Sequence, residues 1–347
     1  VLAYGILQII RPYFFKIDPH IQEVFSLQIG AEVWIAFIAF AIFVGLLAGA
    51  LPAFLLAKQR AYESLKNSGT IKLLKGLNFR KALIVGQFAL SLIFITSAII
   101  LNRQFDYALN YDLGFDRENI LHIELHGNDF NVVATEFGRQ AGINNVAGLG
   151  YVMGVGRLYT EYARNPDEID SISIGYQPIT ANYTSQMNHE FVAGRPFPEV
   201  MNDSTETYII LNETAVKELR LGTVEEAIGK TVVLEGNSAL EVIGVVEDFH
   251  YNRISQDIGP YAFRYIPKDF QIINLKLSPG NYDQTLASLE VAWNKLDNVH
   301  EFDYAFYDEQ IAEAYAMYSM LNLIIGFVAF LAITISVLGL LGMVIYC

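Results

Sequence analysis

The sequence predicts an α+β membrane protein in which transmembrane α-helices flank a mixed α/β extracytoplasmic domain. Three observations lead to this fold class. Hydrophobic residues make up 53% of the 347 residues, which is high for a soluble protein. Three long runs, 33–57, 82–101 and 314–347, contain no charged residue. Between the second and third runs, strand-like and helix-like patterns follow one another in a strongly acidic segment.

The three apolar runs are long enough to cross a bilayer. A helix needs about 20 residues to cross roughly 30 Å of hydrocarbon. Residues 1–10 are interpreted as the end of a truncated helix, because the chain does not begin with methionine. The last run reaches Cys347 without a basic flank. We therefore interpret it as belonging to a truncated repeat and expect a further segment after it.

The distribution of charge predicts the orientation in the membrane. Segment 58–81 contains seven basic residues and one acidic residue, so the positive-inside rule makes it a cytoplasmic linker. Residues 102–313 then form a domain on the other side. Residues 102–319 contain 14 basic and 33 acidic residues, a net charge of −19. Such a domain disfavours nucleic acid as a partner and favours cationic partners or plain solubility.

Tyrosines occur at both points where the acidic domain meets the apolar runs. We expect them to form a belt in the headgroup layer, since the ring of tyrosine is apolar and its hydroxyl is polar. These tyrosines are Tyr107, Tyr111, Tyr315 and Tyr318.

The first half of the acidic domain shows weak strand and helix patterns. Alternation of apolar and polar residues predicts a strand at 120–125, and a short helix is expected at 131–141. Further strands, interrupted by proline and glycine, are predicted at 147–153, 171–174 and 178–184.

The second half has clearer patterns. A strand at 208–211 leads to Asn212, which we predict to cap a helix at 213–219. The β-branched runs 231–234 and 240–246 are joined by a polar turn and predict a hairpin.

The pattern in the last part of the acidic domain predicts a βαβ unit. It consists of a strand at 272–277, a helix at 282–296 and a strand at 302–306. A helix at 308–318 is then expected to run without a break into the last apolar run.

Motifs for enzymatic chemistry are absent from the sequence. It contains no phosphate-binding Gly-x-x-x-x-Gly-Lys-Ser/Thr motif and no Gly-x-Ser-x-Gly elbow. The glycine-rich run 148–156 lacks the spacing of a dinucleotide loop and is interpreted as a flexible turn. The sequence therefore predicts no catalytic residue and no cofactor.

Metal binding has weak support in the sequence. Cys347 is the only cysteine, so cysteine-based metal sites and internal disulfides are excluded within this chain. Asp248 and His250, which follow Glu247, would lie on one face of an extended segment, but no third ligand is identifiable. His122 and His126 lie around a strand rather than on a helix. We expect these residues to have structural roles and predict no metal site.

The apolar runs themselves contain few features. Gly45 and Gly49 form a Gly-x-x-x-Gly step that permits close helix packing, although chance explains it equally well. Gln87 and Asn322 are uncharged polar residues within runs that lack ionisable groups. Because ion-coupled transporters usually have buried ionisable groups, this composition argues against a secondary transporter.

Several local sequences, in this order, resemble FtsX-like permeases with a MacB-like periplasmic core domain. Residues 80–121 are similar to the entry helix and first strand of that domain. Residues 49–66 are similar to the end of the preceding permease repeat, with Ala61 where the family commonly has proline. The other matching strings are FVAGRPF (191–197), IILNETAVKEL (209–219), AIGKTV (227–232) and VIGVVEDFHYNRI (242–254).

The resemblance implies a division of the chain. Residues 1–57 would be the end of a first permease repeat, with a truncated helix at 1–10 and a helix at 33–57. The linker 58–81 would be cytoplasmic. The next repeat would supply a transmembrane helix at 82–101, the periplasmic core domain at 102–313 and a transmembrane helix at 314–347. The protein is then a multi-pass protein of the bacterial inner membrane.

The resemblance also implies a function. Permeases of this type work with a cytoplasmic ABC ATPase, as homodimers or heterodimers in membrane lipid. They transmit the motion of the ATPase to a periplasmic domain, a mechanotransmission that exports or extracts a periplasmic substrate. The alternative is a regulatory permease that controls an envelope enzyme without transport. In either case ATP hydrolysis is expected in a separate subunit, and a periplasmic protein or substrate is a further partner.

Overall fold

The computed structural model describes residues 30–31, 34–46, 49–50, 74–201 and 205–346. The chain falls into two compact units, Val1–Phe79 and Arg80–Cys347. In the first unit, the described part of the predicted span 33–57 contains an apolar helix, Trp34–Leu46. The predicted helix 1–10 and most of the linker 58–81 lie outside the described residues.

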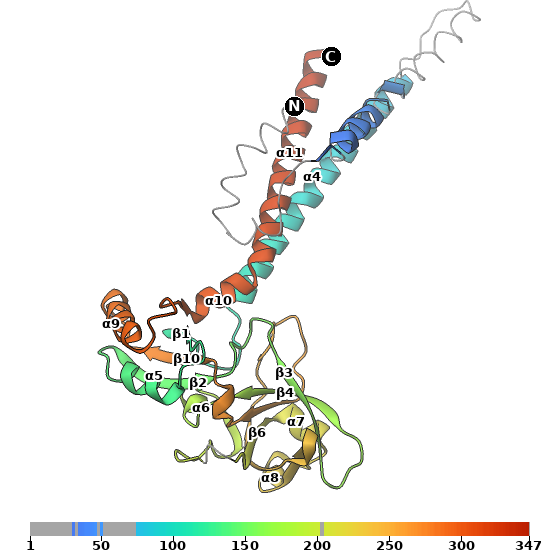
Figure 1. The fold of residues 1–347 in the computed structure, drawn as a ribbon. Helices are drawn as coiled ribbons and strands as arrows, with labels where there is room; N and C mark the ends of the chain where they lie inside the picture. Colours follow the sequence, from blue (N-terminus) through green and yellow to red (C-terminus); the bar gives the residue numbers. More distant parts are fainter. Residues whose placement is uncertain (1–29, 32–33, 47–48, 51–73, 202–204, 347) are drawn as a thin grey trace, which may run out of the picture. The chain divides into compact units, whose positions relative to one another are not determined.

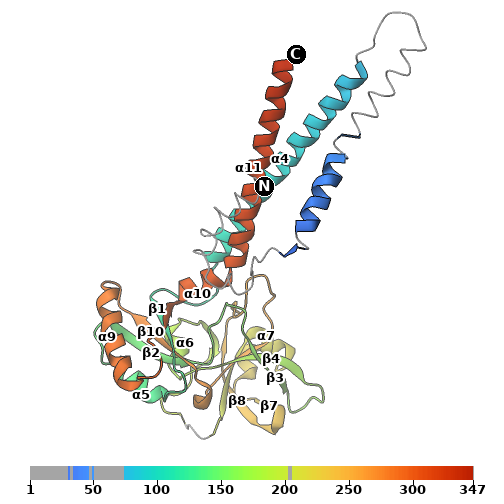
Figure 2. The ribbon, with the colours of Figure 1, turned by 45° about the horizontal axis from the view of Figure 1, so that its top comes forward.

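Two helices of the second unit are long and apolar enough to cross a membrane. Helix α4 spans Leu74–Leu109 and helix α11 spans Ala316–Tyr346. Figures 1 and 2 both show them leaving the α/β domain together. Helix α4 extends beyond the predicted run 82–101, because no glycine or proline interrupts the polar residues that follow it.

Polar side chains link α4 to α11. The hydroxyl oxygens of Ser91 and Ser336 lie 3.0 Å apart and are buried between the helices. Closer to the domain, the amide of Asn322 donates a hydrogen bond of 3.0 Å to the side-chain oxygen of Asn102. An unpaired polar group is costly in hydrocarbon, so these bonds fix how the two helices face each other.

Four strands of the domain form an antiparallel sheet with the order β11-β1-β10-β2. Helix α5 connects β1 to β2, and helix α9 connects β10 to β11, which gives the split βαβ arrangement. The predicted βαβ unit is therefore present, but β1 lies between its two parallel strands. The elements are β1 Ile120–Glu124, α5 Phe130–Phe137, β2 Ile143–Leu149, β10 Ile272–Leu277, α9 Tyr282–Leu296 and β11 Tyr304–Phe306.

The two faces of this sheet have different neighbours. Leu121 and Ile123 of β1 point to the face covered by α5 and α9, where Phe137 and Trp293 are fully buried. Ile120 of β1, Leu149 of β2 and Ile272 of β10 point to the opposite face and join a second hydrophobic cluster. The sheet is thus buried on both sides, as its mostly apolar strands require.

Seven further strands form the second lobe. Their order is β5-β8-β6-β9-β4-β3-β7, and β7 also pairs with β8, so six of the strands close into a barrel with β5 beside it. The barrel encloses its own core, which includes Leu211 and Val242. The strands are β3 Tyr159–Arg164, β4 Ile172–Pro178, β5 Phe191–Gly194, β6 Tyr208–Asn212, β7 Thr231–Leu234, β8 Ala239–Val246 and β9 Tyr261–Arg264.

Three short helices accompany the barrel: α6 Tyr183–Gln186, α7 Glu213–Glu218 and α8 Val224–Ala227. Two single turns of 3-10 helix, Glu235–Asn237 and Pro267–Asp269, complete the lobe. The whole lobe is inserted between β2 and β10. Because Leu149 and Ile272 are paired partners at the ends of those strands, the chain leaves and re-enters the four-stranded sheet at one place.

The structure confirms the mixed α/β domain and most of the predicted elements. The predicted strand 178–184 is wrong, because Pro178 already ends β4 and Ile179 forms only an isolated bridge to Leu149 before the chain turns into α6. The strand predicted at 147–153 instead spans Ile143–Leu149. Strands β3, β5 and β9 were not predicted.

Candidate functional site

The domain end of α4 and the short helix that leads into α11 are buried in one hydrophobic cluster. Ala108, near the end of α4, is 7% exposed, and Ile311 in helix α10, Tyr307–Ala314, is 2% exposed. Both belong to the cluster that contains Tyr151 and Phe249 of the domain. Interiors are packed closely enough to transmit displacement. A movement of either helix end therefore reaches the domain through side-chain contacts, and this junction is the candidate functional site.

The predicted unbroken helix 308–318 is interrupted at Tyr315. The backbone of Tyr315 is not helical, with ψ near 3°, and its hydroxyl accepts a hydrogen bond of 3.2 Å from the amide of Ile254. Tyr307, Ile311 and Tyr315 are spaced four residues apart and are all buried in the cluster. Helix α10 thus lies on the domain, and Figure 1 shows the change of direction into α11.

The buried position of Tyr315 also changes the interpretation of the tyrosine belt. Tyr315 is 6% exposed and lies within the domain core instead of at a headgroup layer. Tyr107, on α4, is 63% exposed, and its place in a headgroup layer stays a prediction.

Arg117 joins the ends of α4 and α10. Its Nη2 donates to the carbonyl oxygen of Leu109, the last residue of α4, and its Nε lies 3.3 Å from a carboxylate oxygen of Asp308. Asp308 is in the first turn of α10. A cation at a helix C-terminus and an anion at a helix N-terminus are both favourable. Sequence reasoning missed Arg117, since nothing in its local pattern distinguishes it from an ordinary turn residue.

Two further contacts hold α10 on the domain. The hydroxyl of Tyr307 donates to the carbonyl oxygen of Met153 at 2.9 Å. The side-chain oxygen of Gln310 lies 2.6 Å from Nδ1 of His122 on β1. These bonds connect α10 to both the four-stranded sheet and the loop that leads into the barrel lobe.

Two histidines are buried close to this junction. His122 stacks edge-on against Tyr307, and His189 lies among the rings of Phe115, Phe249 and Phe263. Burial lowers the pKa of His122 to about 4 and the pKa of His189 to about 3. Both imidazoles are therefore neutral at neutral pH.

Acid should destabilise the domain through these two histidines. Above pH 6.5 they are neutral in both states and contribute nothing. As the pH falls below 6.5, the unfolded chain takes up protons that the folded domain does not, so the free energy of unfolding falls, down to pH about 4 for His122. Replacing His189 with phenylalanine removes about one of the protons taken up on unfolding. The slope of the unfolding free energy against pH should then fall by roughly 1.4 kcal/mol per pH unit.

The measurement is urea unfolding between pH 7 and pH 5, followed by the fluorescence of Trp293 in a Trp34→Phe background, since the chain has two tryptophans. His126→Asn, which removes an imidazole at an exposed position with positive φ, is the matched control. An identical slope in the His189 and control variants would contradict the assignment.

The residues weighed for metal binding have structural roles. Asp248 accepts hydrogen bonds from the side chain of Asn212 at 2.7 Å and from the amide and hydroxyl of Thr214 at 3.0 and 2.7 Å. His250 packs edge-on against Tyr111. In the described ranges, no group of three or more His, Cys, Asp or Glu residues could hold a metal ion.

Asn212 has the capping role that the sequence predicts. Its side-chain oxygen accepts from the amides of Ala215 and Tyr261, and its side-chain nitrogen donates to Asp248 and to the carbonyl of Gly259. The motif strings that contain Asn212 and Asp248 are thus joined by one buried network. These two strings therefore stabilise the barrel lobe. The residues they have in common with the family are explained here by hydrogen bonds within the fold.

The glycine-rich run 148–156 is part of a packed structure, not a flexible turn. Gly148 lies in β2, and a Cβ there would approach the ring of Phe130 to 2.9 Å. Tyr151 and Met153 in the same run are fully buried. Rings approach the backbone closely at Gly148 and Gly150, and the positive φ of Gly154 and Gly156 favours glycine there.

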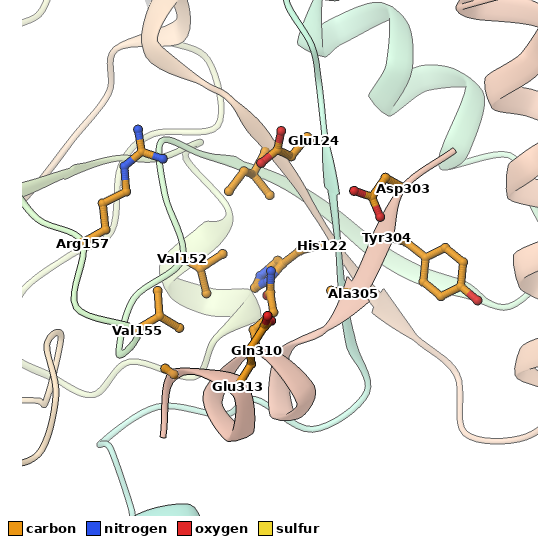
Figure 3. Close-up of a pocket in the computed structure, with 12 residues that line it drawn as sticks. His122, Glu124, Val152, Val155, Arg157, Asp303, Tyr304, Ala305, Gln310 and Glu313 are labelled. Carbon is orange, nitrogen blue, oxygen red and sulfur yellow. The ribbon is translucent and has the colours of Figure 1, made fainter. Parts of the chain in front are cut away.

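A pocket of about 370 Å³ opens beside α10, on the face of the sheet opposite α5 and α9. Figure 3 shows residues from three parts of the chain around one space. Strands β1 and β11 contribute His122, Glu124 and Ala305, and Asp303 comes from the residue just before β11. Helix α10 contributes Gln310 and Glu313, and the loop after β2 contributes Val152, Val155 and Arg157.

Comparison with solved structures finds similar domains at low sequence identity. The periplasmic region of MacB from Actinobacillus actinomycetemcomitans is 18% identical, with a TM-score of 0.44 over 58% of this chain and 94% of that one. The extracellular domain of the noncanonic ABC-type transporter YknZ from Gram-positive bacteria is 17% identical, with a TM-score of 0.39 over 54% of this chain and 98% of that one.

A domain of a putative permease from Porphyromonas gingivalis is 16% identical, with a TM-score of 0.39 over 55% of this chain and 90% of that one. A search of curated proteins gives no match. The model of the MacB-like periplasmic core domain matches residues 82–291, which is more than half of the chain. The chain therefore belongs to the family of ABC permeases that carry a MacB-like periplasmic core domain.

Proposed function

We propose that this chain transmits the motion of a separate ABC ATPase through α4 and α11 to its periplasmic domain, for export or extraction of a periplasmic substrate. The observation that carries this proposal is the junction, where the end of α4 and helix α10, which leads into α11, are buried in one hydrophobic cluster. Arg117 adds a direct polar link between the helix ends. The family supports a permease role in an ABC system and a place in the inner membrane with a periplasmic segment.

The division of the chain belongs to the same proposal. Residues 1–57 would end a first permease repeat, 58–81 would be cytoplasmic, and 82–101 and 314–347 would span the membrane on either side of the periplasmic domain 102–313. Two described helices with the length and composition of spans support the last part of this division. Dimers of permeases in membrane lipid would complete the assembly.

Replacing Arg117 with alanine tests the coupling. The helix ends would lose their shared guanidinium contact, so the response of the ATPase to periplasmic factors should fall on the order of tenfold, which corresponds to about 1.4 kcal/mol of coupling. The measurement is ATP turnover of the full-length permease with its ATPase in nanodiscs, with and without candidate factors. Arg139→Ala, at an exposed arginine paired only within its own helix turn, is the matched control.

The same assay separates the two readings of the family. Turnover that responds to a drug, peptide or lipoprotein supports transport. Turnover that responds only to an envelope hydrolase supports the regulatory alternative. If no ATPase associates with the full-length protein, the proposed function is wrong.

A further inference from the structure

Strand β11 is an open edge of the four-stranded sheet. It pairs with β1 on one side, and within the described part of the chain no strand pairs with its other side. The opposite edge, β2, is covered: Thr180 donates its amide to the carbonyl of Gly148, and Asn182 donates to the carbonyl of Val146. An uncovered edge presents backbone donors and acceptors to any extended chain that reaches it.

The pocket of about 370 Å³ lies directly beside this edge. Ala305 of β11 lines it, together with Asp303 just before the strand and Glu124 from the neighbouring strand β1. Val152 and Val155 supply apolar lining. Figure 3 shows these side chains around the space next to the strand. An extended chain added to β11 would direct alternate side chains towards this pocket.

The charges of the pocket indicate which side chains would fit. Glu124, Asp303 and Glu313 line it, with Arg157 as the one basic residue among its lining residues. Among the described residues, Asp303 and Glu313 have no ion-pair partner. The pocket therefore favours a lysine or arginine side chain, whose apolar stem can lie against the valines.

We propose that β11 and this pocket form a docking site for an extended, cationic peptide segment. The peptide adds as a strand to β11, and its basic side chains enter the pocket. Backbone hydrogen bonds supply affinity and the carboxylates supply selectivity. A second copy of this chain is disfavoured at the edge, because it would bring the same carboxylates against one another and each domain carries a net charge of −19 over residues 102–319.

The site adjoins the junction. Residue Tyr307 begins α10 immediately after Phe306 ends β11, and Glu313 of α10 lines the pocket. Peptide binding would thus change the surroundings of α10. This consequence for ATPase coupling rests on the proposed function, whereas the binding itself does not.

The experiment measures binding to the full-length protein in nanodiscs of zwitterionic lipid, without ATPase or nucleotide. The probe is a fluorescent peptide of alternating lysine and valine, and fluorescence anisotropy gives its Kd. The double variant Asp303→Asn, Glu313→Gln should weaken binding about tenfold. The matched control, Asp283→Asn with Glu290→Gln on the exposed side of α9, removes the same charge elsewhere and should change Kd by less than about twofold.

Two competitor peptides test the mode of binding. A peptide that is N-methylated at every backbone nitrogen keeps the charge but has no N–H to donate to a strand edge, so it should not compete. A peptide with glutamate in place of lysine should also fail. The proposal is overturned if the N-methylated peptide competes equally, if the control variant weakens binding as much as the pocket variant, if spermidine competes as well as the peptide, or if no binding occurs. Because no ATPase is present, these failures would leave the proposed function untouched.

Discussion

An alanine inserted between Ala312 and Glu313 should abolish the response of the ATPase to periplasmic factors. An extra residue rotates everything after it by about 100°, since an α-helix has 3.6 residues per turn. Tyr315 would leave the hydrophobic cluster and lose its hydrogen bond from Ile254, while Tyr307 and Ile311 would stay in place. Helix α11 would then no longer have a fixed orientation relative to the domain.

The measurement is ATP turnover in nanodiscs, together with the amount of protein in the membrane. The membrane level should stay near that of the parent protein. An alanine inserted after Ile169, which is 96% exposed in the loop between β3 and β4, is the control and should leave the response intact. Equal responses in the two insertion variants would refute the coupling through α10.

Replacing Gly194 with alanine should destabilise the barrel lobe by about 2 to 5 kcal/mol. Gly194 has a φ of 73°, which costs a side-chain-bearing residue about 1 to 2 kcal/mol. A Cβ there would lie 2.2 Å from the carbonyl oxygen of Ile243 and 2.8 Å from the Cα of Gly244, its partner on β8. Because both contacts are backbone, relief requires separating β5 from β8, at a cost of about 1 to 3 kcal/mol.

Gly229→Ala separates the two contributions. Gly229 has a φ of 82°, but nothing lies within 4 Å of a Cβ built there. The Gly229→Ala variant should therefore lose only the stability that the positive φ costs an alanine, about 1 to 2 kcal/mol. Urea unfolding of the domain is the measurement. If both variants lose the same stability, the close approach of the strands is not the cause.

Much of the fold could be predicted from the sequence, because its clearest elements have strong local signals. Asn212 followed by a short helix, and the hairpin of β7 and β8, are confirmed. The order of the strands was not predictable, since β1 pairs with β10 across an interval of more than a hundred residues. Strand β3, in which half-buried and exposed residues alternate over its first four positions, has no apolar run to reveal it.

The junction was predictable only in part. The helix that leads into the last apolar run was found, but its interruption depends on a contact between Tyr315 and Ile254, which are far apart in the sequence. Arg117 has its role because the ends of α4 and α10 meet in space. The acidic character of the domain was visible in the composition, whereas the pocket beside β11 requires the packing of three distant segments.

Because the barrel lobe is inserted between β2 and β10, the lobe and the four-stranded sheet place separate constraints on the sequence. Since Leu149 and Ile272 are paired neighbours, a tight turn could join the two strands and preserve the order of the four-stranded sheet. The lobe is therefore an exchangeable module, free to diverge in surface and loop length. The segment Tyr151 to Met153, where the chain enters the lobe, is less free to change. These buried residues also contact α10, so they must pack against both the lobe and that helix.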